Sequence, residues 1–226
     1  MLFDLRSRGR RRTVQATYLG LAILMGAGLV LFGVGTGVGG GGLLNGIGGS
    51  GGGGSQKQVV SQQEKAALAQ VNANPNSAPA WGNLLQARWE SAGQGSNFDT
   101  STQSFTASGR RELQGAAQAW QRYLALAKTP DPSLAGLAAK VYVGLNDWAG
   151  VAAAQEQLTS SEPNVPKAYA CLAFAAYAAG QTRKAELASA KALSVSPKSQ
   201  QVQTNQFIQQ AKGSASAAQT VYVQNC

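Results

Sequence analysis

The chain has 226 residues, a formal net charge of +9, two cysteines and no histidine. The absence of histidine removes the side chain that most often serves as a general base and as a metal ligand. The carboxylates are spread singly along the chain. The sequence therefore predicts a protein that is not an enzyme and that holds no cofactor or metal. Because its Lys and Arg residues beyond the N-terminus are scattered and form no basic stripe, we also expect no nucleic-acid binding.

The chain begins with a basic segment that is followed by an apolar one. Residues 1–12 include five arginines, and residues 13–34 carry no charge. A helix of about 20 apolar residues spans the hydrocarbon core of a bilayer, so residues 13–34 are predicted to form a transmembrane helix. Arginines are retained on the cytoplasmic side. We therefore expect a single-pass protein of the cell membrane, with residues 1–12 in the cytoplasm and an extracytoplasmic C-terminal domain.

A cleaved signal peptide is the alternative interpretation of residues 13–34. The apolar core of a signal peptide is shorter, about 7–15 residues, and it ends at a small-x-small cleavage site. Here the apolar run is longer and is followed by glycines without a clear A-x-A motif. A retained anchor is favoured, and cleavage would instead give a soluble secreted protein.

Residues 35–55 consist mostly of glycine and serine. Such a composition is typical of a flexible linker, whose ends would lie roughly 25 Å apart on average. The linker would keep the C-terminal domain close to the membrane and let it tilt.

From residue 56 onward, apolar residues recur at intervals of three and four, which indicates helices and an all-α fold class. Prolines mark the boundaries between the periodic segments. The predicted helices are 56–73, 77–92, 110–128, 133–145, 147–160, 165–179, 182–195 and 198–212. Residues 93–109 are predicted to be a polar, flexible insert, with the alternative that Phe98 or Phe105 packs onto the helices. Residues 213–226 are predicted to be a C-terminal tail.

One stretch, residues 166–197, has small, aromatic and turn residues at spacings that form a pattern. These residues are Tyr169, Leu172, Ala173, Gly180, Ala185, Ala192 and Pro197. The pattern resembles the tetratricopeptide repeat (TPR), a helix-turn-helix unit of about 34 residues. Ser189 stands where the second helix usually has an aromatic. Weaker units are residues 132–163, with Asn146 at the turn, and a unit that begins at Trp81.

The resemblance implies a TPR-like helical-hairpin solenoid over residues 56–212 that binds proteins or peptides. In this family the first helix of each pair lines a concave groove. The motif positions place six residues in this partner-binding groove: Gln86, Trp89, Lys140, Val143, Phe174 and Tyr177. The alternative is that Trp89 and Tyr177 pack as core. Four other aromatic residues are predicted to be core: Trp81, Trp120, Trp148 and Tyr169.

The two cysteines are Cys171, on a predicted buried helix face, and Cys226, the last residue. A disulfide between them is possible in an oxidising compartment. Without a framework of further cysteines, the favoured interpretation is one small buried residue and one free thiol in the tail.

An anchor followed by an outside TPR domain resembles the layout of membrane-anchored bacterial TPR proteins associated with translocons. This layout implies an interaction scaffold or adaptor for unidentified protein or peptide partners, in envelope protein assembly or translocation. Two alternatives stay open. One is a secreted soluble peptide-binding TPR protein, and the other is a non-catalytic subunit of an envelope enzyme. The sequence leaves the oligomeric state undetermined.

Overall fold

The computed structural model describes residues 54–226, with side chains from residue 62 onward. The predicted basic segment, membrane span and linker lie outside the described residues, apart from residues 54 and 55 of the linker, which belong to the first described helix. The helices are α2 (Gly54–Ala73), α3 (Ala78–Ala92), α4 (Ala107–Leu126), α5 (Pro132–Gly144), α6 (Trp148–Ser161), α7 (Pro166–Ala178), α8 (Thr182–Val195), α9 (Lys198–Lys212) and α10 (Ala215–Asn225). Between α3 and α4 lie a short 3-10 helix, η2 (Gly95–Asn97), and the strands β1 (Phe98–Asp99) and β2 (Ser104–Phe105).

The expected all-α character is confirmed for the described part of the chain, and eight of its helices match predicted ones. From residue 54 onward, no helix combines the length and the apolar character that a bilayer crossing requires. Helix α4 begins three residues earlier than predicted. Its N-terminus is capped by Thr106, whose hydroxyl accepts a hydrogen bond from the N–H of Gly109 at 3.3 Å.

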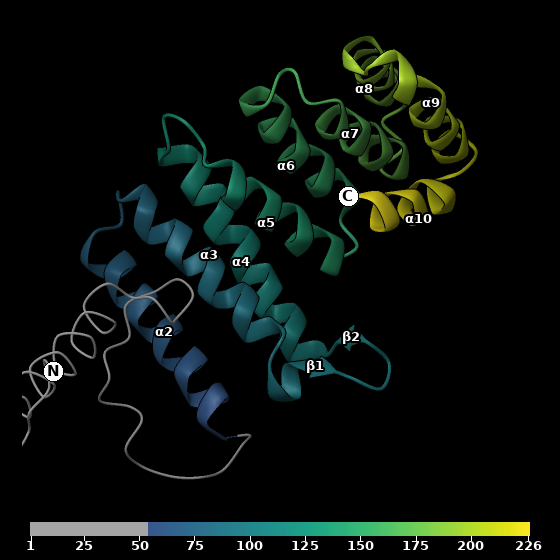
Figure 1. Ribbon diagram of the computed structural model, residues 1–226. Helices are drawn as coiled ribbons and strands as arrows, with labels where there is room; N and C mark the ends of the chain where they lie inside the picture. The colour runs from purple at the N-terminus through teal and green to yellow at the C-terminus, as the bar shows by residue number, and fades with distance from the viewer. Residues whose placement is uncertain (1–53) are drawn as a thin grey trace, which may run out of the picture. The chain divides into compact units, whose positions relative to one another are not determined.

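The helices pack in the order in which they follow one another along the chain (Figure 1). Helices α3 and α4, α5 and α6, and α7 and α8 form successive pairs, and α2 packs on α3. The core between the helices is rich in alanine. Ala173 of α7 and Ala185 of α8 are both fully buried, as expected for helices that cross closely.

The pairs α5–α6 and α7–α8 begin with the same residue type, proline, and have the same turn geometry between their two helices. Pro132 begins α5 and Pro166 begins α7. The turn residues Asn146 and Gly180 repeat the spacing of the two prolines. They have φ values of +57° and +71°, as expected for residues that end a helix in the left-handed region. In both turns the next N–H donates to the carbonyl oxygen five positions earlier, at 2.9 and 2.8 Å.

The insert between α3 and α4 is not the flexible polar segment that its composition predicts. Strands β1 and β2 pair antiparallel, with Phe98 opposite Phe105, and their rings meet edge to face at 5.2 Å between centroids. The Phe105 ring also lies 6.1 Å from the ring of Trp89 in α3. The alternative expectation, that one of the phenylalanines packs onto the helices, therefore applies to Phe105, which packs against the core.

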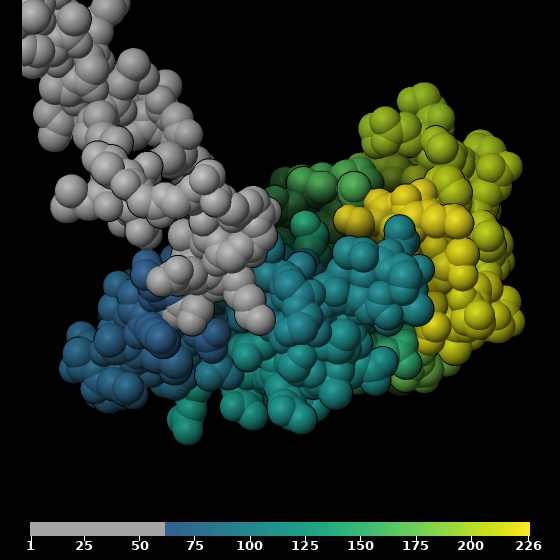
Figure 2. All heavy atoms as spheres, turned by 90° about the horizontal axis from the view of Figure 1, so that it is seen from below, coloured from purple at the N-terminus to yellow at the C-terminus, as the bar shows by residue number. Residues whose placement is uncertain are grey.

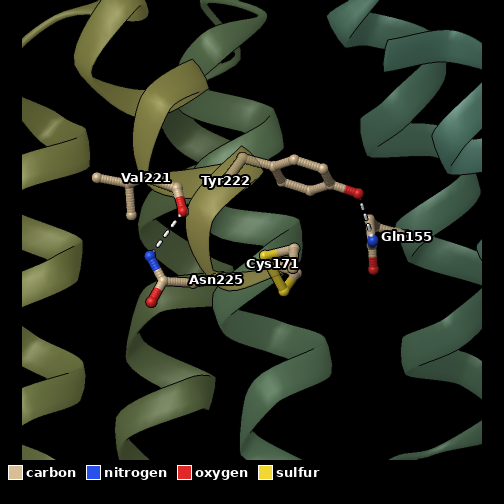
Figure 3. The surroundings of a disulfide bond; sticks show 6 residues. Gln155, Cys171, Val221, Tyr222 and Asn225 are labelled. Carbon is tan, nitrogen blue, oxygen red and sulfur yellow. Dashed lines mark hydrogen bonds between the residues drawn. A yellow bond between two sulfur atoms is a disulfide. The ribbon is translucent and has the colours of Figure 1, made fainter. Parts of the chain in front are cut away.

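Two predictions for the C-terminus are wrong. Residues 213–226 are not a tail outside the helical domain, because most of them form α10, which packs on α7 and α9. Cys226 is not a free thiol, because it is joined to Cys171 in a disulfide (Figure 3). The chain reverses direction after α9 and brings its last residue to α7. This approach of Cys226 to Cys171 cannot be inferred from the positions of the two cysteines in the sequence. A disulfide of this kind is typical of proteins in an oxidising, extracytoplasmic environment.

Candidate functional site

Two grooves flank helix α7. The smaller, of about 310 Å³, lies between α7, α9 and α10, and we call it the α7–α9 groove. Its lining residues are Pro166, Lys167, Ala170, Cys171, Phe174, Gln200, Gln203, Thr204, Phe207 and Asn225. The larger, of about 580 Å³, lies between α6, α7 and α8, and we call it the α6–α8 groove. Its lining residues are Glu156, Tyr169, Leu172, Arg183, Lys184, Leu187, Ala188 and Lys191.

One of the two predicted groove residues of α3, Trp89, lies beside the chain's own insert. Trp89 is half-buried, and Phe105 of β2 packs near its ring at 6.1 Å. Gln86 is half-buried on the same helix. In the space-filling view of Figure 2, the blue-green insert and the yellow α10 both lie on the face that is turned to the viewer.

The remaining four predicted groove residues differ in their exposure. Lys140 of α5 is exposed, and Val143 of the same helix is half-buried. Phe174 of α7 is only 2% exposed and Tyr177 is half-buried. Of the six predicted residues, only Phe174 lines either of the two grooves beside α7. The structure thus does not bring the six together around one of these grooves.

The four aromatic residues that were predicted as core divide into two groups. Trp120 and Trp148 are buried, which confirms the prediction for both. Trp81 is only partly buried, and its indole N–H donates to the carbonyl oxygen of Pro75 at 2.8 Å. Tyr169 is also only partly buried, and it lines the α6–α8 groove.

Helix α10 is fixed in place by buried contacts as well as by the disulfide (Figure 3). The hydroxyl of Tyr222 accepts a hydrogen bond from the side-chain amide of Gln155 in α6 at 2.7 Å. Burial raises the pKa of the Tyr222 phenol, and the bond from Gln155 partly opposes that shift. The Tyr222 ring also meets Trp148 edge to face at 5.5 Å. These contacts hold α10 in position as one wall of the α7–α9 groove.

The α6–α8 groove has an apolar surface that is open to solvent. Tyr169 and Leu172 of α7 and Ala188 of α8 lie in it, and Leu187 of α8 is 66% exposed beside them. Isolated exposed leucines are common, but apolar residues gathered in a hollow are typical of interaction sites. Sequence reasoning missed Leu187. The available signal was a leucine set between Arg183 and Lys191 at intervals of four residues, on an otherwise charged helix face.

Charged side chains form the edge of the α6–α8 groove. Lys184 and Glu156 form an ion pair at 2.8 Å. The ammonium group of Lys191 lies 5.8 Å from the centroid of the Tyr169 ring, within the range of a cation–π contact. Arg183 adds a further positive charge to the edge. Three basic groups and one carboxylate therefore surround the apolar floor.

The positive charge of the described domain is concentrated at its C-terminal end. Residues 54–165 contain eight basic and eight acidic residues, which balance. Residues 166–226 contain six basic residues and a single acidic one, Glu186. Both grooves lie in or beside this C-terminal part of the domain. The electrostatic field around them therefore favours anionic partners.

Three charged side chains, Glu64, Arg88 and Glu112, form a cluster between α2, α3 and α4. From residue 62 onward, no three His, Cys, Asp or Glu side chains gather as a metal site would require. Glu64 of α2 lies near Arg88 of α3, with 3.5 Å between Oε1 and Nε. Partial burial and the nearby charge of Glu64 raise the pKa of Glu112 in α4, whereas Arg88 lowers it. Such a cluster is typical of contacts that hold helices together.

None of the family models matches the chain, and searches of curated proteins and of solved structures also found no match. The TPR resemblance therefore depends on the motif residues and on the helix geometry described above. We infer the function from the grooves and from the location that the disulfide indicates.

Proposed function

We propose that this chain is a single-pass membrane protein whose extracytoplasmic, TPR-like domain is an interaction scaffold or adaptor for proteins or peptides. The observation that carries the proposal is the α6–α8 groove. It places an apolar floor open to solvent, with Leu187 66% exposed, on a domain of stacked helix pairs. Assembly or translocation of envelope proteins is the process that fits such a scaffold.

The TPR-like part of the proposal is supported by the spacing of the helix pairs. Pairs α5–α6 and α7–α8 begin at Pro132 and Pro166, and this spacing equals the length of the TPR unit, about 34 residues. In repeat proteins each unit contacts mainly its neighbours, and a terminal element covers the end of the stack. Helix α10 departs from this neighbour order, because it packs on α7 and α9 and its Tyr222 bonds to Gln155 of α6.

The extracytoplasmic part of the proposal is supported by two independent features. The Cys171–Cys226 disulfide is typical of oxidising compartments. The arginines of residues 1–12 precede the apolar run of residues 13–34, which is the charge asymmetry of an anchor with its N-terminus in the cytoplasm. Together they favour a disulfide-bonded domain on the side of the membrane opposite the arginines.

The location is tested by labelling a cysteine introduced at Gly52 with a membrane-impermeant maleimide. Intact cells should be labelled, because residue 52 follows the proposed span. Labelling that occurs only after the membrane is permeabilised would overturn the proposed orientation. Recovery of the protein in the soluble fraction, with a new N-terminus beyond residue 34, would instead support the secreted alternative.

The binding role is tested by purifying the full chain from membranes in mild detergent and identifying bound proteins by mass spectrometry. Leu187→Glu places a charge in the α6–α8 groove, and Val202→Glu places the same charge on α9 at a residue that is 69% exposed. A partner that is lost with Leu187→Glu and retained with Val202→Glu supports the proposal. If both variants retain every partner of the parent chain, the groove is not the binding surface.

A further inference from the structure

We propose that the α6–α8 groove binds an acidic amphipathic helix of a partner protein. This inference rests on the proposed scaffold function and specifies the chemistry of its partner. The helix would place apolar side chains on the floor formed by Tyr169, Leu172 and Leu187, and carboxylates beside Arg183 and Lys191.

The groove is open and wide, and its volume is large enough to take side chains of a partner. Its volume of about 580 Å³ lies within the range of ligand sites, roughly 300–1,000 Å³. A helix that docks in such a groove contributes apolar residues at intervals of three and four from one face. Leu187 and Ala188 of α8, with Tyr169 and Leu172 of α7, provide the apolar surface against which that face would pack.

The charges around the groove select an acidic partner. Glu156, the carboxylate at its edge, is already paired with Lys184 at 2.8 Å. Among residues 62–226, no carboxylate lies within ion-pair distance of Arg183 or Lys191. These two cations frame Leu187 one helical turn away on either side, so acidic residues that flank an apolar residue of the partner would reach both. Complementary charges of this kind increase the association rate and exclude basic partners.

Two other occupants fit the groove less well. A second copy of this domain would bring its own basic C-terminal part, with six basic residues and one acidic residue in 166–226, against the same charges. An anionic lipid surface also complements the cations and would contact the exposed Leu187, but Leu172 is only 6% exposed and lies deeper in the groove than a flat surface reaches. An acidic helix satisfies both the shape and the charge.

The test uses the full chain in neutral detergent and a fluorescent helical peptide of about 14 residues, or roughly four turns. The peptide carries leucines on one face at intervals of three and four, glutamates beside them and one photoreactive leucine. Fluorescence anisotropy should show binding that weakens at high salt. Irradiation should crosslink the peptide to residues 183–191. A matched peptide with lysines in place of the glutamates should not bind.

Variants of the groove complete the test. Leu187→Glu should weaken binding by roughly tenfold or more, whereas Val202→Glu, at an equally exposed residue of α9, should leave it unchanged. A double variant, Arg183→Glu with Lys191→Glu, should lose the glutamate peptide and gain the lysine peptide. This exchange of charge preference is a result that mere unfolding cannot produce.

The outcomes separate this inference from the proposed function. The inference is overturned if the glutamate peptide does not bind, or if it binds Leu187→Glu as well as the parent chain. It is also overturned if anionic phospholipid vesicles bind in its place and that binding is sensitive to Leu187→Glu. The scaffold function survives these results if a partner of the full chain is still lost on Leu187→Glu, and it fails separately if no partner depends on that residue.

Discussion

The side-chain amide of Gln155 in α6 donates to the hydroxyl of Tyr222 in α10 at 2.7 Å, and both residues are buried. The two residues are 67 positions apart, so this bond ties the last helix to the middle of the domain. Tyr222→Phe leaves the Gln155 donor buried and unpaired, which should cost about 1–3 kcal/mol of unfolding free energy. Chemical unfolding followed by circular dichroism measures this loss.

A double variant provides the control for this bond. Combining Tyr222→Phe with Gln155→Leu removes both polar partners, which is often nearly neutral. The double variant should therefore be more stable than the sum of the two single losses predicts. Strict additivity would show that the two side chains do not interact in solution.

The disulfide should stabilise the domain by restricting its unfolded state. Cys171 and Cys226 are separated by 55 positions, and for a loop of that length the chain-entropy description gives about 4 kcal/mol as an upper value. Cys226→Ser should lower the unfolding free energy and speed amide hydrogen exchange in α10. Reductant should destabilise the parent chain and leave the variant unchanged. A parent chain whose melting temperature is insensitive to reductant, while its thiols become reactive, would contradict this expectation.

The insert should contribute to stability through Phe105. The Phe105 ring lies 6.1 Å from the Trp89 ring, measured between centroids. It also packs on Gly144 of α5, where an added Cβ would be only 2.9 Å from the Phe105 ring. Because Phe105 is only partly buried, Phe105→Ala should cost about 1–2 kcal/mol, less than the roughly 3–5 kcal/mol of a fully buried phenylalanine. Thr100→Ala, at an exposed position of the same insert, is the control and should have no effect. Equal stability of both variants would mean that the insert is passive.

The sequence predicted the helices well because their periodicity and their boundaries are local signals. Proline, glycine and asparagine mark the ends of α5, α6, α7 and α8, and the left-handed turns at Asn146 and Gly180 follow from which residues tolerate positive φ. The small residues Ala173 and Ala185 were expected at close helix crossings, and both are fully buried. These features need no knowledge of distant parts of the chain.

The insert, the tail and the grooves could not be predicted, because each depends on contacts between distant segments. For the insert, the sequence left open whether Phe98 or Phe105 packs onto the helices, and only the structure shows that Phe105 meets both Phe98 and Trp89. The tail becomes a helix held by Gln155 and Cys171, through contacts that span 67 and 55 positions of the chain. The charged residues four positions before and after Leu187 indicated its exposure, but the groove beside it is a property of the space between α6 and α8, which no local pattern encodes.

The raised pKa of Glu112 predicts a pH-dependent stability. Its carboxyl is partly buried near Glu64, so the folded state binds the proton more tightly than the unfolded chain does. In the unfolded chain the pKa of this carboxyl is near 4.5. Protonation therefore stabilises the fold below pH 4.5, and that contribution is lost as the pH rises through the raised pKa. Glu112→Gln should melt at a higher temperature than the parent chain at pH 7 and at the same temperature near the acid limit.

A matched substitution isolates this effect. Glu90→Gln removes a carboxylate from an exposed position of α3 and should not reproduce the change between acid and neutral pH. The expected effect of Glu112→Gln is small, because the carboxyl is only partly shielded from solvent. A variant that is less stable than the parent chain at pH 7 would show that the attraction to Arg88 outweighs burial.

Ser189 provides the last prediction, because its hydroxyl is buried in α8 and has no hydrogen-bond partner among residues 62–226. It occupies the same place in the α7–α8 pair as Gln155 does in the α5–α6 pair, and Gln155 does have a partner in Tyr222. An unpaired buried hydroxyl costs free energy, so Ser189→Ala should raise the unfolding free energy by about 1 kcal/mol. Ser194→Ala is the control on the exposed side of the same helix, where the hydroxyl donates to the Lys191 carbonyl at 2.8 Å, and it should change little. If Ser189→Ala lowers the melting temperature while Ser194→Ala does not, the Ser189 hydroxyl must be hydrogen-bonded in solution, for example to a buried water, and the packing around α8 must be looser than the structure shows.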